Sequence, residues 1–259
     1  MLIVYLLNLG FILLVMTGLW TLSIPRRDPS FIDSVWPLGF VLLAVSSALL
    51  AGWPLFGSSL VLPLVTLWGL RLATHLFLRW RKEGLDRRYA DLMAKAPGGR
   101  VHLFNLVAVF LLQGSLLWLV ALPVQHAVME GARPLTGLAW AAIGLFALGF
   151  LFETIGDWQL ARFKADPANK GQVMDRGLWR YTRHPNYFGD ACVFWGLWLI
   201  AVSDGTGWWT AIGPAFLTWT LVKWSGAALL EKNLHESRPG YADYVRRTSG
   251  FIPWFPKRD

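Results

Sequence analysis

The sequence is poor in charged residues, in cysteine and in closely spaced histidines. Only 15% of its 259 residues are charged, whereas an ordinary soluble domain has about a quarter. The single cysteine, Cys192, excludes an internal disulfide and a metal site built from several thiolates. The five histidines stand at positions 75, 102, 126, 184 and 235 without the His-x-x-x-His or His-Glu-x-x-His spacing of a metal centre, so we expect no bound metal.

Apolar residues are abundant instead, at 55% of the chain. A helix that crosses a membrane needs roughly 20 mainly apolar residues. Runs of this kind predict an all-α integral membrane protein, a bundle of seven transmembrane helices. The predicted spans are 2–22, 36–53, 58–80, 102–123, 134–152, 187–202 and 207–230. The first run has no basic segment before it and no clear cleavage site, so we interpret it as a helix and not as a signal peptide.

The net charge of +8 is distributed unevenly between the connecting loops. Lysine and arginine follow the first, third, fifth and seventh spans, and the alternate loops carry only Arg133. The positive-inside rule then predicts an N-terminus outside and a C-terminus in the cytoplasm, in what we expect to be a bacterial inner membrane. Because the basic residues follow membrane topology, we expect membrane lipids as neighbours and no nucleic-acid partner. Short connections predict a single domain over 1–259.

One stretch, from Gly177 to Asp190, gathers arginine, histidine, asparagine, tyrosine and aspartate beside an apolar run. Pro185 disfavours a helical conformation at the residue before it and suits the first position of a helix, so a helix is expected to start there. The free N–H groups of its first turn would favour an anion. A helix cap does not explain the other polar residues, which favours a binding role for Arg180, Tyr181, Arg183, His184, Asn186, Tyr187 and Asp190.

Two further segments carry polar side chains on the same predicted side. After Glu153 the helix is expected to continue with Asp157, Arg162 and Lys164, either as hydrogen-bond and phosphate ligands of a nucleotide or as a solvated helix end. In the C-terminal tail, two tyrosines and two arginines are candidates to clamp a nucleotide: Tyr241, Tyr244, Arg246 and Arg247. The aromatic residues 251–255 that follow are equally compatible with an interface anchor.

Few polar residues interrupt the first half of the chain. Arg71 falls inside the third predicted span, where an ionisable residue suggests function. Asp33 precedes the second span, either as a partner of Arg71 or as a helix N-cap. Trp36 follows closely and would shape the same pocket. Tyr89 is expected in a loop.

These residues resemble the steroid 5α-reductase family, and more closely its bacterial seven-span branch. The resemblance is good from Glu153 onward and weak before it. Its specific pieces are Gly177-Leu-Trp-x-Tyr181, Asn186-Tyr-Phe-Gly-Asp190, Tyr241-x-x-Tyr244 and Phe251-Ile-Pro253.

Members of that family are membrane reductases that use NADPH, so the resemblance implies a substrate half at 1–123 and a cofactor half at 134–259. Carried over by position, it implies cofactor contacts from Asp157, Lys164, Asn186, Asp190, His235 and Tyr244, with Arg162, Arg180, Tyr181, Arg183 and His184 nearby. One departure concerns the substrate. Steroid-reducing members have a Gln-Glu pair on the second helix and a tyrosine on the third, where this chain has Asp33-Ser-Val-Trp36 and Trp68.

We therefore expect an NADPH-dependent oxidoreductase that reduces the C=C bond of a lipophilic, enone-like small molecule, with Asp33, Trp36 and Arg71 as catalytic candidates. The Arg-His-Pro-x-Tyr element also resembles the isoprenylcysteine and phospholipid methyltransferases, which use S-adenosylmethionine. A non-catalytic lipid-binding or assembly protein with the same fold is the third hypothesis.

Overall fold

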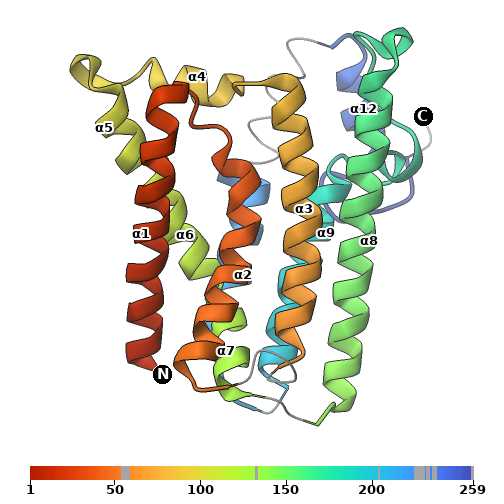
Figure 1. The fold of residues 1–259 in the computed structure, drawn as a ribbon. Helices are drawn as coiled ribbons and strands as arrows, with labels where there is room; N and C mark the ends of the chain where they lie inside the picture. The colour runs from red at the N-terminus through yellow and green to blue at the C-terminus, as the bar shows by residue number, and fades with distance from the viewer. Residues whose placement is uncertain are drawn as a thin grey trace. The chain divides into compact units, whose positions relative to one another are not determined.

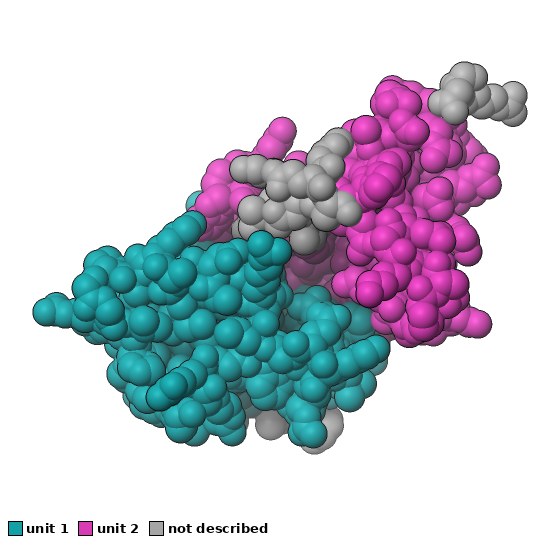
Figure 2. Space-filling model, turned by 90° about the horizontal axis from the view of Figure 1, so that it is seen from above, with its two compact units in different colours: residues 1–134, 204–213 teal, residues 135–203, 214–259 magenta. Residues whose placement is uncertain are grey.

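The computed structural model describes residues 1–53, 59–131, 134–203, 205–224, 231, 234 and 238–257. The chain forms two compact units, which Figure 2 colours separately. Unit 1 comprises Met1–Pro134 and Asp204–Gly213, and unit 2 comprises Leu135–Ser203 and Pro214–Asp259. Regular structure in the described residues is helical, apart from an isolated parallel bridge between Thr182 and Ser249.

Unit 1 is built on three long helices, of which α2 and α3 pack side by side (Figure 1). A π-helix, η2, interrupts the fourth predicted span, and a short helix, α4, lies between α3 and that span. The elements are α1 (Leu2–Arg26), α2 (Ile32–Leu50), α3 (Val61–Glu83), α4 (Arg87–Met93), η1 (Pro97–Gly99), α5 (Val101–Asn105), η2 (Leu106–Leu111), α6 (Leu112–Val120), α7 (Leu122–Glu130) and η5 (Trp208–Ala211).

Unit 2 is organised around the long helix α8, along which α9 packs. Its elements are α8 (Gly137–Ala165), η3 (Pro167–Asn169), η4 (Gly177–Arg180), α9 (Pro185–Ala201), most of α10 (Ile212–Trp219), η6 (Thr220–Trp224) and α12 (Tyr241–Arg247). The predicted continuation of the fifth span is confirmed, because Asp157, Arg162 and Lys164 all lie on α8.

Five helical segments in the described part of the chain are long and apolar enough to cross a membrane. They are Leu2–Arg26, Ile32–Leu50, Val61–Glu83, Val101–Val120 and Gly137–Ala165, and they correspond to the first five predicted spans. The sixth predicted span is the helix α9, of 17 residues. The seventh begins in η5, α10 and η6, and its remaining residues, 225–230, lie outside the described ranges.

The starts of α9 and α2 were both predicted from the sequence. The expected start at Pro185 is confirmed, since α9 begins there and His184 is its N-cap with an extended φ of −139°. The N-cap alternative for Asp33 is wrong. The cap of α2 is Phe31, and Asp33 lies within the first helical turn, so its carboxylate is available to other groups.

Glycines allow α8 and α9 to approach closely. A Cβ atom on Gly149 would lie 2.5 Å from the carbonyl oxygen of Gly189 and 2.6 Å from the backbone nitrogen of Val193. Backbone atoms cannot move aside as a flexible side chain can, so only glycine fits at this crossing. Small residues at such contacts are the usual means by which membrane helices pack.

Gly149→Ala is therefore expected to destabilise unit 2 by roughly 1–3 kcal/mol, through overpacking against the α9 backbone. The measurement is the thermal midpoint of unfolding in detergent. Gly144→Ala is the matched control, because this glycine of the same helix has no atom within 4 Å of the added Cβ. Equal midpoints for the two variants would contradict the proposed close approach.

Candidate functional site

The Asp33 carboxylate of unit 1 is held by donors from a different part of the chain. The Tyr89 hydroxyl donates to Asp33 Oδ1 at 2.5 Å, and Arg88 Nη2 donates to Oδ2 at 2.9 Å. Gln113 Nε2 donates in turn to the Tyr89 oxygen at 2.8 Å. We call Asp33, Arg88, Tyr89 and Gln113 the Asp33 cluster. It contains a carboxylate, a phenol, an amide and a guanidinium joined by hydrogen bonds.

Local structure explains how Tyr89 and Gln113 reach this cluster. Tyr89 was expected in a loop, but it lies on α4, whose N-cap Asp86 accepts a hydrogen bond from the backbone N–H of Arg88. Gln113 lies on α6 directly after the π-helix η2. A π turn changes the direction in which later side chains project, and such turns are frequent at functional sites.

Tyr89 is only 7% exposed. Burial, the nearby charge of Asp33 and the hydrogen bond to it raise the pKa of Tyr89 well above its ordinary value, and these effects outweigh the opposite influence of Gln113 and Arg88. The phenol therefore keeps its proton at neutral pH. That proton is donated to the Asp33 carboxylate.

The other two catalytic candidates of unit 1 lie deeper in its helices. Trp36 is half-buried, with its ring edge-on to Phe40 at a centroid distance of 4.7 Å. Arg71 is half-buried on α3, three residues after the buried Trp68. The hydrogen-bond partners identified for Asp33 are Arg88 and Tyr89. The expected pairing of Asp33 with Arg71 stays a prediction.

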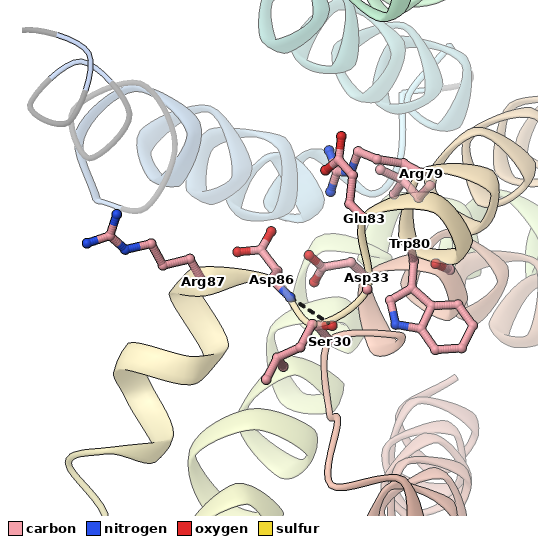
Figure 3. A pocket seen from close by; sticks show the side chains of 11 residues that line it. Ser30, Asp33, Arg79, Trp80, Glu83, Asp86 and Arg87 are labelled. Atoms are coloured by element: carbon pink, nitrogen blue, oxygen red, sulfur yellow. Dashed lines mark hydrogen bonds between the residues drawn. The ribbon is translucent and has the colours of Figure 1, made fainter. Parts of the chain in front are cut away.

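An open pocket of about 270 Å³ lies beside the Asp33 cluster (Figure 3). Its lining includes Ser30, Asp33 and Ser34 near the start of α2, Arg79 and Glu83 near the end of α3, and Asp86. The Ser34 hydroxyl is buried and has no hydrogen-bond partner among the described residues. The pocket thus offers a small polar space in contact with Asp33.

In unit 2, the stretch before α9 and the C-terminal tail contact each other near the carboxylate of Glu231. Arg183 binds it with two hydrogen bonds, from Nε at 2.8 Å and from Nη2 at 3.2 Å. His184 Nε2 lies 2.8 Å from Glu231 Oε1, and its ring stacks on Tyr187. Arg183 also donates to the carbonyl oxygen of Thr248 at 2.7 Å. We call Arg183, His184 and Glu231 the Glu231 clamp.

Other tail contacts extend this arrangement. The Tyr244 hydroxyl donates to the carbonyl oxygen of Trp179, and Tyr241 packs against Tyr244 with a ring-centroid distance of 5.8 Å. Both tyrosines are buried, which leaves little ring surface for stacking on a nucleotide. Arg183, Tyr241 and Tyr244, predicted as cofactor ligands, therefore have structural contacts inside the unit.

The carboxylate of Asp157, on α8, meets the first turn of α9. Asn186 Nδ2 donates to Asp157 Oδ1 at 3.2 Å, and both Asp157 and Asp190 are buried. Asn186 also accepts from the backbone N–H of Tyr187. Asp157, Asn186 and Asp190 were all predicted from the sequence as candidate site residues.

The predicted phosphate ligands are mainly exposed. Arg162 lies over the Trp158 ring with its guanidinium carbon 5.6 Å from the centroid. Lys164 and Arg180 are exposed, and Tyr181 is partly exposed and contacts Phe255 edge-on. Arg246 pairs with Asp243 in the same helix, and Arg247 lies 3.8 Å from Asp175. His235 lies outside the described residues.

The Glu231 clamp lowers the pKa of the Glu231 carboxyl group. Burial alone would raise the pKa of its carboxyl, but the hydrogen bonds from His184 and Arg183 outweigh burial and hold this pKa at about 2, against an ordinary 4.5. A group whose pKa is lowered on folding stabilises the folded protein above its unfolded pKa. That contribution is lost as the pH falls through the folded pKa.

The stability of unit 2 is therefore expected to fall as the pH decreases from about 4.5 to about 2. In Glu231→Gln this part of the acid dependence is expected to disappear, because the amide does not titrate. Thermal midpoints measured over this pH range for both proteins test the prediction, and parallel curves for wild type and variant would contradict it.

No solved structure matches the chain. A relative from Schizosaccharomyces pombe, the uncharacterized protein C594.04c, is 25% identical over 269 residues, covering 91% of this chain and 75% of that protein. The model of the family described as "Protein of unknown function (DUF1295)" matches residues 19–248, so the chain belongs to this family of proteins.

Proposed function

We propose that the protein is a membrane-embedded, NADPH-dependent reductase of a lipophilic enone, related to the steroid 5α-reductases. The proposal includes seven transmembrane helices, an N-terminus outside and a cytoplasmic C-terminus in a bacterial inner membrane. The observation that carries it is the Tyr89 hydroxyl, held between Asp33 and Gln113 beside a pocket. The family resemblance supplies the expectation of NADPH.

The Asp33 cluster offers the groups that the substrate end of such a reaction requires. NADPH, when bound, supplies a hydride for the β-carbon of the enone. Tyr89 would turn its hydroxyl from Asp33 toward the substrate and supply the proton that completes saturation of the C=C bond, while Gln113 holds the phenol oxygen in place. Arg88 would balance the charge of the Asp33 carboxylate. Arg71 stays the candidate that stabilises the enolate oxygen.

The donors at the end of α8 in unit 2 fit a phosphate-bearing cofactor. Arg162 and Lys164 are exposed cations on the last turns of that helix, and Asp157 and Asn186 provide an acceptor and an amide for ribose or nicotinamide groups. S-adenosylmethionine has no phosphate, so these cations favour NADPH over the methyl donor.

Cofactor binding tests the proposal without knowledge of the substrate. NADPH is expected to raise the thermal midpoint of the purified protein in non-ionic detergent, since a ligand that binds only the folded state stabilises it by about 2.7 kcal/mol at 100 times its Kd. The double variant Arg162→Gln/Lys164→Gln should lose most of this increase, whereas Arg26→Gln, an exposed cation of unit 1, should retain it. An increase with S-adenosylmethionine alone would refute the reductase assignment.

A further inference from the structure

The C-terminal tail of unit 2 is held rigidly although it is not helical. The backbone N–H of Trp254 donates to the carbonyl oxygen of Tyr181, and that of Lys257 donates to the carbonyl oxygen of Arg247, both at 2.9 Å. Thr182 Oγ1 donates to the carbonyl oxygen of Phe251 at 2.8 Å. Pro253 and Pro256 restrict the backbone further. The tail is thus fixed against the segment that precedes α9.

The side chains of this fixed tail are exposed and apolar. Ile252 is 65% exposed, Trp254 71% and Phe255 76%. Phe255 contacts the rings of both Tyr181 and Trp254. Single exposed apolar residues are common, but several adjacent ones on a rigid segment indicate a surface that is covered by a partner.

Three basic residues belong to the same segments as these aromatic residues or contact them through the backbone. Arg180 precedes Tyr181 in the chain, and the backbone hydrogen bond from Lys257 to Arg247 brings those two residues together. Asp175 lies 3.8 Å from Arg247 and offsets part of this charge. We call Arg180, Tyr181, Arg247, Trp254, Phe255 and Lys257 the tail patch. Three positive charges against one negative leave it cationic.

The tail patch lies close in sequence to the start of a proposed membrane span. Tyr181 lies four residues before Pro185, where α9 begins, and α9 is the sixth proposed span. Tryptophan and tyrosine beside lysine and arginine are typical of the zone where a membrane protein meets lipid headgroups. Each basic residue near an anionic membrane surface adds to the attraction between protein and lipid.

We infer that the tail patch binds anionic lipid headgroups, with Trp254 and Phe255 inserted among the lipids and Arg180, Arg247 and Lys257 on the phosphates. This assigns to lipid three residues that the sequence analysis gave to the cofactor: Arg180, Tyr181 and Arg247. Rigidity favours binding, because the aromatic side chains are presented without further ordering of the backbone. The inference does not depend on the reductase activity.

Full-length protein in nanodiscs tests the inference. Discs of pure phosphatidylcholine are compared with discs that contain phosphatidylglycerol, and the thermal midpoint is followed in each. The anionic lipid is expected to raise the midpoint of the wild type. The triple variant Arg180→Gln/Arg247→Gln/Lys257→Gln should lose at least half of that increase. The control Arg26→Gln/Arg81→Gln/Lys82→Gln makes the same charge change in unit 1, at basic residues that follow the first and third proposed spans, and should lose clearly less of it. The result that would overturn the inference is the same increase in both triple variants.

A second measurement locates the aromatic residues. Bromine-labelled lipids quench tryptophan fluorescence on contact, and Trp254→Phe should remove part of the quenching that phosphatidylglycerol labelled near its headgroup produces. Trp68→Phe is the control, because this tryptophan of α3 is fully buried and its replacement should leave the quenching unchanged. If Trp254→Phe leaves the headgroup-level quenching unchanged, Trp254 does not contact lipid and the inference is refuted.

Discussion

Arg183→Ala is expected to destabilise unit 2 by roughly 3–5 kcal/mol, because it leaves the partly buried carboxylate of Glu231 without its main partner. In the folded protein this guanidinium forms two hydrogen bonds with Glu231 and one with the carbonyl oxygen of Thr248. The substitution therefore removes the positive charge that compensates Glu231. It also removes the hydrogen bond that joins the segment before α9 to the C-terminal tail. For a protein of this size the thermal midpoint should decrease by roughly 10 °C.

Two comparisons show whether the Glu231 clamp causes this loss. Arg246→Ala removes an arginine whose ion pair with Asp243 is exposed, and surface pairs contribute little, so its midpoint should stay near that of the wild type. Adding Glu231→Gln to Arg183→Ala should recover part of the stability, because the uncompensated charge is gone. If Arg183→Ala and Arg246→Ala had the same midpoint, the clamp would not stabilise the unit.

Tyr89→Phe is expected to reduce the rate of NADPH-dependent reduction by about 10²–10⁴-fold, the usual contribution of a positioned general acid. The substitution removes only the hydroxyl that donates to Asp33 and accepts from Gln113. The assay follows NADPH oxidation by purified protein supplied with lipid extract of the host. The thermal shift with NADPH should be retained, because Tyr89 belongs to unit 1 and the expected cofactor ligands belong to unit 2.

Tyr5→Phe is the matched control for this experiment. Tyr5 is also a buried tyrosine of unit 1, and its hydroxyl lies 3.3 Å from His126 Nδ1. The Tyr5→Phe variant should lose a similar hydrogen bond and keep its reductase activity. Equal rates for Tyr89→Phe and Tyr5→Phe would show that Tyr89 is not the proton donor.

Unit 2 was the more predictable part from sequence because its polar residues are concentrated. Arg183, His184 and Asn186 adjoin Pro185 in the sequence, so one proline predicted both the start of α9 and the polar character of its first turn. Glu231 was not selected, although it is the centre of the clamp. It lies 47 residues after His184, and no local pattern indicates such a pair.

Unit 1 was less predictable because its contacts join short segments across long separations. Tyr89 lies in a helix of seven residues, too short to show a hydrophobic period, and its hydroxyl reaches Asp33 across 56 residues. Gln113 depends on a π turn that composition does not reveal. The same sequence did predict the long helices well, because length and apolar content are local properties.

Isotope transfer tests the proposed reductase function most directly. Purified protein is incubated with membrane lipids of the host and with either NADPH deuterated at the transferred position or S-adenosylmethionine labelled in its methyl group. The reductase proposal predicts a lipid product that carries one transferred deuterium, formed about 10²–10⁴-fold more slowly by Tyr89→Phe. A labelled methyl group in a lipid, with no deuterium transferred from NADPH, would contradict it.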